Sequence, residues 1–331
     1  MHAGARGDAY DDAFESYLDA LKQQIAITPL DPSQLMNRAD PGNWVSVKIF
    51  CSSTFKDQLQ ERHVLKTVVM PDLEVWGRER GIEIVMVDLL WGIPMNSSAA
   101  FTIRTCLGEL DVCRRMNSAP YFLYLGGQRF GWPPSRADIS DDSLCDQYDW
   151  LDGASVTSME VLHGALRTGN SNAIYCLRDP SYVSLSVPTA ERADFTESDA
   201  VAAAKQAALL HAIESAGSGH IIKYNPATDN ASTNAATSAR GSWDFFASEV
   251  AAQLKLLMSR QYPRQSAGAP GSLLAMRRQH ALFADTLVDH TTPRQEILSK
   301  MWDAIHTASL AKEGSGRRLV VVGADSGRGK V

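Results

Sequence analysis

The last fourteen residues of the chain combine glycine and lysine in the spacing of a phosphate-binding loop. Leu319 to Val322 form a short apolar run, and a glycine-rich segment then ends in Gly329-Lys330. In a P-loop the backbone N–H groups bind phosphates and the lysine contacts the terminal ones. We therefore predict an ATP-binding P-loop whose nucleotide contacts come from Gly327, Gly329 and Lys330. The alternative is a glycine-rich turn that matches the motif by chance.

Val331 stands where a P-loop has the Ser or Thr that holds Mg²⁺. Nucleotide binding can survive this change, whereas Mg²⁺ binding and ATP hydrolysis are left open. Because the motif lies at the end of the sequence, we expect the chain to be the front part of a larger protein, cut at the start of an NTPase domain.

Three hydroxyl side chains, Ser52, Ser53 and Thr54, follow the first predicted strand and precede a helix. Hydroxyl and N–H groups at the start of a helix can bind an anion. They can also form a capping cluster, in which Thr54 or Asp57 accepts from free helix N–H groups. The residue types alone favour the capping cluster.

Glu160 and His163 lie three residues apart on a predicted helix and so share one face of it. A carboxylate near the carboxyl edge of a sheet can act as a general base or contact a ribose. The alternative is a solvent-facing glutamate with a partner on its own helix, which is the commoner situation. Glu109 is a weaker candidate of the same kind.

Two further strand ends carry candidate site residues. Asp88 closes the second strand and is followed by Trp91 and Gly92, which form either the rim of a site or a turn with one packed tryptophan. Gly126-Gly127 follows the third strand without the spacing of a dinucleotide motif, so we expect turn glycines covered by an aromatic residue.

Strands and helices alternate along the middle of the chain, which predicts a parallel sheet covered on both faces. The order and size indicate a flavodoxin-like, doubly wound five-stranded α/β fold, whose ligand sites form at the carboxyl ends of the strands. We expect loops at 128–154 and 178–193 and a kink at Pro71. The predicted strands are 45–50, 82–87, 121–125, 173–177 and 220–224, and the predicted helices are 57–80, 98–115, 155–167, 196–216 and 243–262.

We divide the chain into four parts. Residues 1–43 hold a helix at 8–24 and a proline-containing linker, and residues 44–262 form the α/β domain. Residues 263–316 are a helical linker, and residues 317–331 begin the P-loop domain.

Composition narrows the class of protein. The net charge of −6 argues against a general nucleic-acid binder or a polybasic membrane patch, and the apolar runs are shorter than the roughly 20 residues of a membrane span. The N-terminus lacks the apolar core of a secretory signal. Five scattered cysteines without a CxxC pair indicate reduced, buried thiols rather than a metal site. We therefore expect a cytoplasmic protein with no bound metal.

Six motifs in order resemble the TIR-like α/β domain at the front of nephrocystin-type proteins, and the corresponding domains of the vault telomerase-associated protein and of NACHT proteins with WD repeats. The resemblance covers about residues 45–262, and His280 to Ala284 also looks like the linker that precedes their P-loop. The motifs are Ser52-Ser53-Thr54-Phe55-Lys56-Asp57 with Glu61-Arg62, Val87 to Gly92, Cys106 to Leu110, Leu125 to Trp132, Ser155 to Glu160 with His163 to Leu166, and Leu177-Arg178-Asp179-Pro180.

The resemblance implies a large STAND-type ATPase whose first domain is regulatory or an effector, with protein-binding repeats after the ATPase. In NAD-cleaving TIR enzymes the catalytic glutamate lies on the helix after strand three, and Glu160 falls on that helix. Two residues depart from the pattern. Leu90 replaces an Arg, and Gln128 replaces a Glu, which puts a polar ligand site in doubt.

The leading hypothesis is therefore a signalling or protein-interaction domain that an adjacent NACHT-type ATPase regulates, with protein partners that include further copies of itself. The alternative is an NAD-cleaving enzyme that uses Glu160, with NAD bound between the Ser52–Thr54 and Asp88–Gly92 loops. A third possibility is a passive scaffold joined to a nucleotide-binding P-loop. A ciliary or flagellar location is implied only by one branch of the family.

Overall fold

The computed structural model contains one parallel sheet of five strands with the order β2-β1-β3-β4-β5. This is the order of the doubly wound, flavodoxin-like fold, so the predicted fold class is confirmed at that level. The structure describes residues 2–25, 45–89, 98–117, 119–139, 142–149, 151–228, 243–263 and 302. The strands are β1 (Val45–Ser53), β2 (Ile82–Asp88), β3 (Tyr121–Gly126), β4 (Ala173–Arg178) and β5 (His220–Tyr224).

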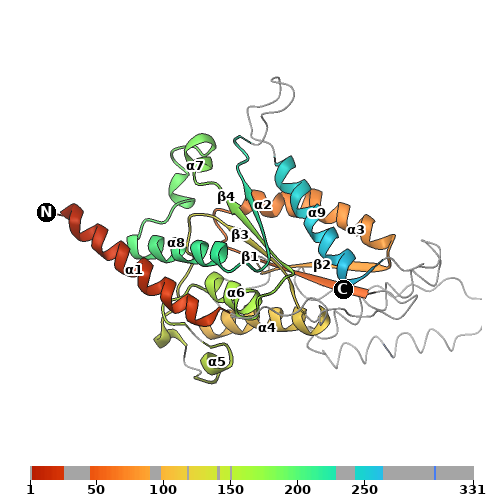
Figure 1. Ribbon diagram of the computed structural model, residues 1–331, viewed down its shortest axis with the longest axis horizontal. Coiled ribbons are helices and arrows are strands. Elements are labelled where there is room, and N and C mark those ends of the chain that lie inside the picture. The colour runs from red at the N-terminus through yellow and green to blue at the C-terminus, as the bar shows by residue number, and fades with distance from the viewer. Residues whose placement is uncertain are drawn as a thin grey trace, which may run out of the picture. The chain divides into compact units, whose positions relative to one another are not determined.

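Helices cover both faces of the sheet (Figure 1). One face packs against α1 (His2–Gln24), α4 (Ala99–Asn117), α6 (Val156–Gly164) and α8 (Ala200–Ser215). The other packs against α2 (Leu59–Val64), the π-helical turn η2 (Leu65–Val69), α3 (Met70–Arg78) and α9 (Asp244–Gln261). Both faces of the three central strands are therefore buried, which explains why β3 and β4 read as nearly continuous apolar runs.

Side chains of the strands alternate between two separate cores. Phe50 and Phe122 are paired in register and their rings stack with centroids 6.1 Å apart, in the core beneath α4 and α6. Ile49 and Leu123 point to the opposite face and pack in the core beneath α3 and α9. The two-residue repeat of a strand thus decides which helices each residue meets.

The two ranges that were predicted as loops contain short helices. The ranges 128–154 and 178–193 are not entirely loops, since they contain α5 (Asp142–Gln147), α7 (Ser181–Ser186) and the 3₁₀ turns η4 (Arg136–Asp138) and η6 (Arg192–Asp194). A third 3₁₀ turn, η5 (Leu166–Thr168), follows α6. These pieces are too short to give a periodic apolar pattern.

The disturbance expected at Pro71 takes the form of the π-helical turn η2 just before it, and Pro71 lies in the first turn of α3. Proline lacks an N–H and its ring crowds the carbonyl four residues earlier, so the preceding turn widens. Ser155 caps α6, because its side chain accepts a hydrogen bond from the N–H of Ser158.

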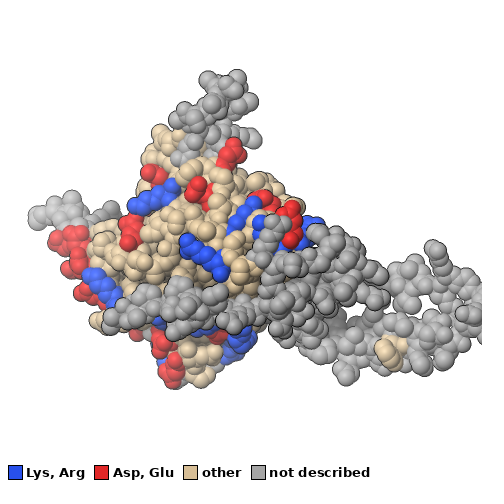
Figure 2. All heavy atoms as spheres, turned by 45° about the vertical axis from the view of Figure 1, so that its right-hand side comes forward, with Lys and Arg blue, Asp and Glu red and all other residues tan. Residues whose placement is uncertain are grey.

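The chain divides into two compact units, residues 1–279 and 280–331. The sheet lies in the first, while the proposed linker helices and the P-loop residues Gly327, Gly329 and Lys330 lie outside the described residues. None of the described helices is long and apolar enough to cross a membrane. On the face in Figure 2, basic and acidic side chains are interspersed over the coloured part of the surface.

Candidate functional site

The candidate site lies where the order of the strands reverses, between β1 and β3. These strands are neighbours, but the connections that leave them run to opposite faces of the sheet, and the fold places ligand crevices at such a reversal. The segments that begin with Thr54 after β1 and with Gly127 after β3 meet there. Gly127 fits because it has no side chain, since a Cβ would lie 2.6 Å from Asp57 Oδ2 and 2.9 Å from Arg178 Nη2.

Ser52 and Ser53 end β1 and point to opposite faces, as alternate strand residues must. The Ser52 hydroxyl donates to Glu160 Oε2 at 2.6 Å, on the side of α6. Ser53 Oγ accepts from Arg62 Nη2 at 2.8 Å and from Nε at 3.1 Å, on the side of α2. The two serines therefore serve different networks rather than one anion site.

Glu160 is buried, with 6% of its surface exposed. The expectation of a solvent-facing glutamate is therefore wrong. Besides Ser52, the Cys106 side chain on α4 hydrogen-bonds to this carboxyl group. Burial raises the pKa of Glu160 from 4.5 to about 7, although the bonds from Ser52 and Cys106 and the charge of Arg62 act in the opposite direction.

Arg62 joins the ends of β1 and β2. Its guanidinium forms an ion pair with Asp88, the last residue of β2, in addition to its bonds to Ser53. It also lies over the ring of Phe55, 5.4 Å from the ring centroid. Asp88 is thus an anchor for α2, while Trp91 and Gly92, predicted beside it, lie outside the described residues.

A second buried network surrounds Arg178, at the end of β4. Its Nη1 donates to Glu61 Oε1 at 2.5 Å and to the Asp57 carbonyl oxygen at 2.7 Å, and its Nη2 lies 3.3 Å from Asp57 Oδ2. Tyr224 at the end of β5 donates to the same Glu61 oxygen at 2.9 Å. Thr54 Oγ1 donates to Asp57 Oδ1 at 2.5 Å.

This arrangement corrects the capping interpretation. The residue at the start of α2 is Gln58, and no side chain caps the helix. Thr54 instead donates to Asp57, and Asp57 in turn pairs with Arg178. A helix cap needs only a local contact, whereas Arg178 lies 121 residues from Asp57 in the sequence. The residue types near Thr54 therefore could not indicate that Asp57 pairs with Arg178.

The pKa values show how strongly this network is desolvated. Burial raises the pKa of Asp57 and of Glu61 in spite of the opposing charge of Arg178. Burial also acts to lower the pKa of Arg178, but the carboxylate of Glu61, the Tyr224 side chain and Asp57 outweigh it and the pKa is raised. Two carboxyl groups therefore share one guanidinium in a dry environment.

Sequence reasoning did not select Arg178, Glu61 or Arg62 as site residues, although all three occur in the quoted motifs. The available signal was a charged residue at the carboxyl end of a buried strand, where a charge is costly unless it is paired. Arg178 ends β4, whose six residues are all buried.

His163 lies on α6 with Glu160, but its contacts go elsewhere. Its Nε2 lies 2.8 Å from Asp111 Oδ1 on α4, and its ring meets that of Tyr148 edge-on at 5.1 Å. Burial lowers the pKa of His163, although Asp111 opposes this. The structure therefore assigns His163 to the packing of α6 against α4.

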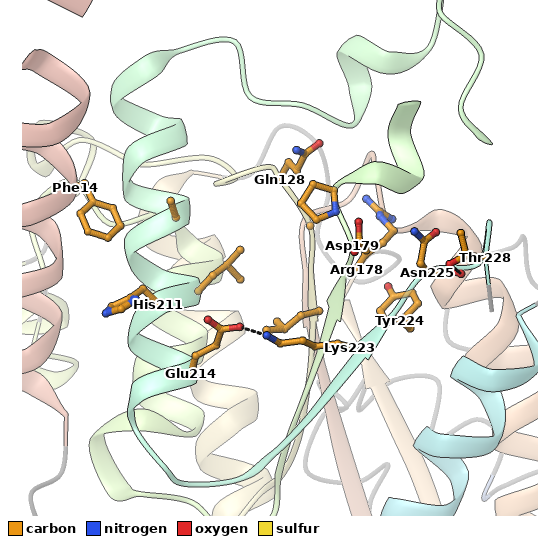
Figure 3. A pocket seen from close by; sticks show the side chains of 15 residues that line it. Phe14, Gln128, Arg178, Asp179, His211, Glu214, Lys223, Tyr224, Asn225 and Thr228 are labelled. Atoms are coloured by element: carbon orange, nitrogen blue, oxygen red, sulfur yellow. Dashed lines mark hydrogen bonds and ion pairs between the residues drawn. The ribbon is translucent and has the colours of Figure 1, made fainter. Parts of the chain in front are cut away.

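A cavity of about 650 Å³ opens at the carboxyl ends of β3, β4 and β5 (Figure 3). Arg178, Gly127 and Tyr224 line it, but Glu160 and Ser52 do not. Among the described residues no group of three or more His, Cys, Asp or Glu side chains is placed to hold a metal ion. All five cysteines are buried and free.

The chain is similar to short segments of several much longer proteins. The chain is 29% identical to telomerase protein component 1 of Rattus norvegicus over 185 residues, which are 51% of this chain and 7% of that protein. It is 30% identical to a TPR repeat-containing protein of Dictyostelium discoideum over 151 residues (41% and 9%). It is 32% identical to NACHT domain- and WD repeat-containing protein 1 of Mus musculus over 82 residues (24% and 5%).

The chain thus spans less than a tenth of the length of these relatives. No family model matches it, and no solved structure matches it significantly. The similarity, at modest identity, supports a relationship to telomerase protein component 1 and to NACHT- and WD repeat-containing proteins.

Proposed function

We propose that this chain is the regulatory, protein-interaction part of a NACHT-related ATP-binding protein, with a TIR-like first domain. The observation that carries the proposal is the pairing of the polar groups at the sheet's carboxyl edge with one another. Glu160 accepts from Ser52, Arg62 is held by Asp88 and Ser53, and Arg178 by two carboxyl groups. A fully satisfied buried polar network makes the structure around it rigid. We infer that this rigid edge serves as a docking surface.

The alternative of NAD cleavage by Glu160 is not favoured. A catalytic carboxylate must come within hydrogen-bond reach of its substrate. Glu160 is buried, its described partners are Ser52 and Cys106, and it does not line the cavity at this edge.

Exposed aromatic residues flank the reversal point and supply the proposed contact surface. Phe55 follows β1 and is 47% exposed, and Trp132 follows β3 and is 50% exposed. Their segments adjoin, because a Cβ on Gly131 would lie 3.1 Å from Thr54 Cγ2. Aromatic residues are enriched in protein interfaces, and we propose that a further copy of the chain is one of the partners.

The test compares Trp132→Ser with Val75→Ser, which removes a similarly exposed side chain (56%) from α3. We expect Trp132→Ser to weaken self-association about tenfold or more, as loss of an aromatic interface anchor does, and Val75→Ser to leave it unchanged. Sedimentation velocity over a concentration series measures the effect. Equal self-association of both variants and the wild type would contradict the proposed surface.

The same preparations decide between interaction and enzymatic function. NAD turnover is measured at the highest concentration reached, for the wild type and for Glu160→Gln. We expect no turnover above background in either protein. Turnover that the substitution abolishes would overturn the proposal in favour of an effector enzyme.

A further inference from the structure

Helix α1 lies outside the alternation of strands and helices that forms the α/β domain. Figure 1 shows α1 alongside α8, and the two helices pack against each other. Residues 26–44 join α1 to β1. We call the surface that α1 covers the α1 seat, and its main parts are α8, Phe130 and Arg167.

Two faces of α8 are buried, and they meet different partners. Gln206 faces the sheet, because its amide donates to the Tyr124 hydroxyl of β3 at 3.2 Å. Ala204 and Ala208 lie about 160° around the helix axis from Gln206, one in each direction, and yet both are fully buried. Since α1 packs along α8, it is α1 that covers these alanines, and their small side chains allow the two helices to approach closely.

An aromatic and two aliphatic side chains anchor α1 on its seat. Tyr17 meets the Phe130 ring edge-on at 5.7 Å, and the Lys205 ammonium group of α8 lies 5.5 Å from the Tyr17 ring centroid. Leu18 and Leu21 share one side of the helix with Tyr17 and are buried in the same core. The seat therefore suits a helix in which an aromatic residue is followed by leucine one and four residues later.

Arg167 holds the last turn of α1. Its Nε donates to Gln24 Oε1 at 2.9 Å, and its other two nitrogens donate to the carbonyl oxygens of Tyr148 and Asp149. Among the described residues, no backbone hydrogen bond joins α1 to another element. Side chains alone therefore attach this helix to the rest of the domain.

The attachment of α1 is small. Among residues 8–24, whose side chains the structure describes, only Tyr17, Leu18 and Leu21 are buried. Most of the stability of a helix in a protein comes from its packing, and elements with few buried apolar contacts open before the core does. Residues 26–44 can span about 60 Å when extended. The helix can therefore leave its seat while β1 stays in the sheet.

We propose that α1 is an exchangeable helix and that its seat accepts α1 of a second copy of the chain. A second copy fits because the structure already displays the complementarity of this helix to this seat, and exchange of an identical element needs no new interface. The inference rests on the proposed self-association. A tethered helix has an effective concentration on the order of millimolar at its own seat, so that exchange needs copies that are held close together.

A labelled peptide of residues 2–25 tests whether the seat accepts a helix from another molecule. Leu21→Asp places a charge at a buried position of the chain's own α1 and should release it. We expect the peptide to bind Leu21→Asp about tenfold or more tightly than the wild type, as measured by fluorescence anisotropy. Asp12→Ser, at an exposed position of α1, should behave as the wild type. Equal affinity of the wild type and Leu21→Asp, or no binding by either, overturns the proposal.

Crosslinking tests exchange between whole chains and needs no destabilising variant, so it decides if Leu21→Asp does not fold. The rings of Phe14 on α1 and His211 on α8 lie 6.1 Å apart, and all five native cysteines are buried. Chains with Phe14→Cys and chains with His211→Cys are mixed and treated with a short bismaleimide. We expect a severalfold higher yield of linked dimer, with the link identified by mass spectrometry, than from Phe14→Cys mixed with Glu74→Cys, at an exposed position of α3. Equal yields from the two mixtures overturn exchange.

The concentration of the mixture separates this inference from the proposed contact surface. At about 1 mM the copies match the effective concentration of the tethered helix, so exchange no longer depends on self-association through Phe55 and Trp132. We therefore expect the same crosslink when both chains also carry Trp132→Ser. Its presence there supports exchange even if the surface of Phe55 and Trp132 fails its own test, and its absence at this concentration overturns exchange.

Discussion

At the scale of single residues, burial decides what Glu160 does. The same side chain on an exposed helix face would ionise near pH 4.5, but here burial raises its pKa to about 7. The carboxyl group therefore stays neutral to a higher pH in the folded protein than an exposed glutamate does, although the hydrogen bonds from Ser52 and Cys106 favour its ionised form. The residue thus acts as a stabilising contact between β1, α4 and α6 whose strength depends on pH.

The direction of that dependence follows from proton linkage. Since the pKa of Glu160 is higher in the folded than in the unfolded chain, its contribution is fully present below about pH 4.5 and is lost as the pH rises through about 7. Each pKa unit corresponds to about 1.4 kcal/mol, so the loss amounts to up to about 3 kcal/mol. We expect Glu160→Gln, which stays neutral, to remove this part of the pH dependence.

Urea unfolding at pH 5 and pH 8 measures the effect. Between these two pH values the free energy of unfolding should fall further for the wild type than for Glu160→Gln. Glu74→Gln, at an exposed position on α3, is the control and should behave as the wild type. Identical pH profiles for the wild type and Glu160→Gln would show that Glu160 ionises normally.

At the scale of elements, Arg178 joins segments that are far apart in the sequence. It ends β4, its carboxylate partners lie in and just before α2, and Glu61 also receives the Tyr224 hydroxyl from β5. The guanidinium further lies over the rings of Tyr182 and Phe195, which are 5.3 and 5.2 Å away at their centroids. One cation thus fixes α2, two strand ends and the segment after β4.

Removal of this cation leaves two buried carboxyl groups without their partner. We expect Arg178→Met to lower the free energy of unfolding by about 3–5 kcal/mol, the cost of breaking a buried ion pair. Arg78→Met removes an exposed pair with Glu74 and should cost about 0.5 kcal/mol or less. Urea unfolding at pH 7 compares the two variants, and a similar small loss in both would show that the Arg178 network contributes little to stability.

At the scale of the whole molecule, the relatives place comparable segments within proteins about ten or more times longer than the matched regions. We propose that this chain's α/β domain is controlled by nucleotide binding at Gly327, Gly329 and Lys330. Lys330→Ala should weaken ATP binding about tenfold or more, since it removes a charge-assisted contact. Arg328→Ala changes a neighbouring charge in the same loop and should have little effect. Equilibrium dialysis with ATP measures both, and equal affinities would refute the P-loop.

The sequence by itself determined the sheet and its cores. Apolar runs, alternation of strands with helices and turn glycines are local or periodic signals, and they predicted all five strands to within three residues at each end. They also predicted the carboxyl edge as the place of the polar residues. Short elements such as α5 and α7 gave no signal, because six residues are too few to show a period.

Only the tertiary structure decided which polar groups pair. Ser52 and Ser53 are adjacent in sequence, yet the pleat sends one to Glu160 and the other to Arg62. Arg178 meets Asp57 across 121 positions of sequence because parallel strands bring their carboxyl ends to one edge. Strand order, and the face of the sheet to which each side chain points, decide such pairs, and local spacing in the sequence encodes neither. Burial then shifts the pKa values of the paired carboxyl groups.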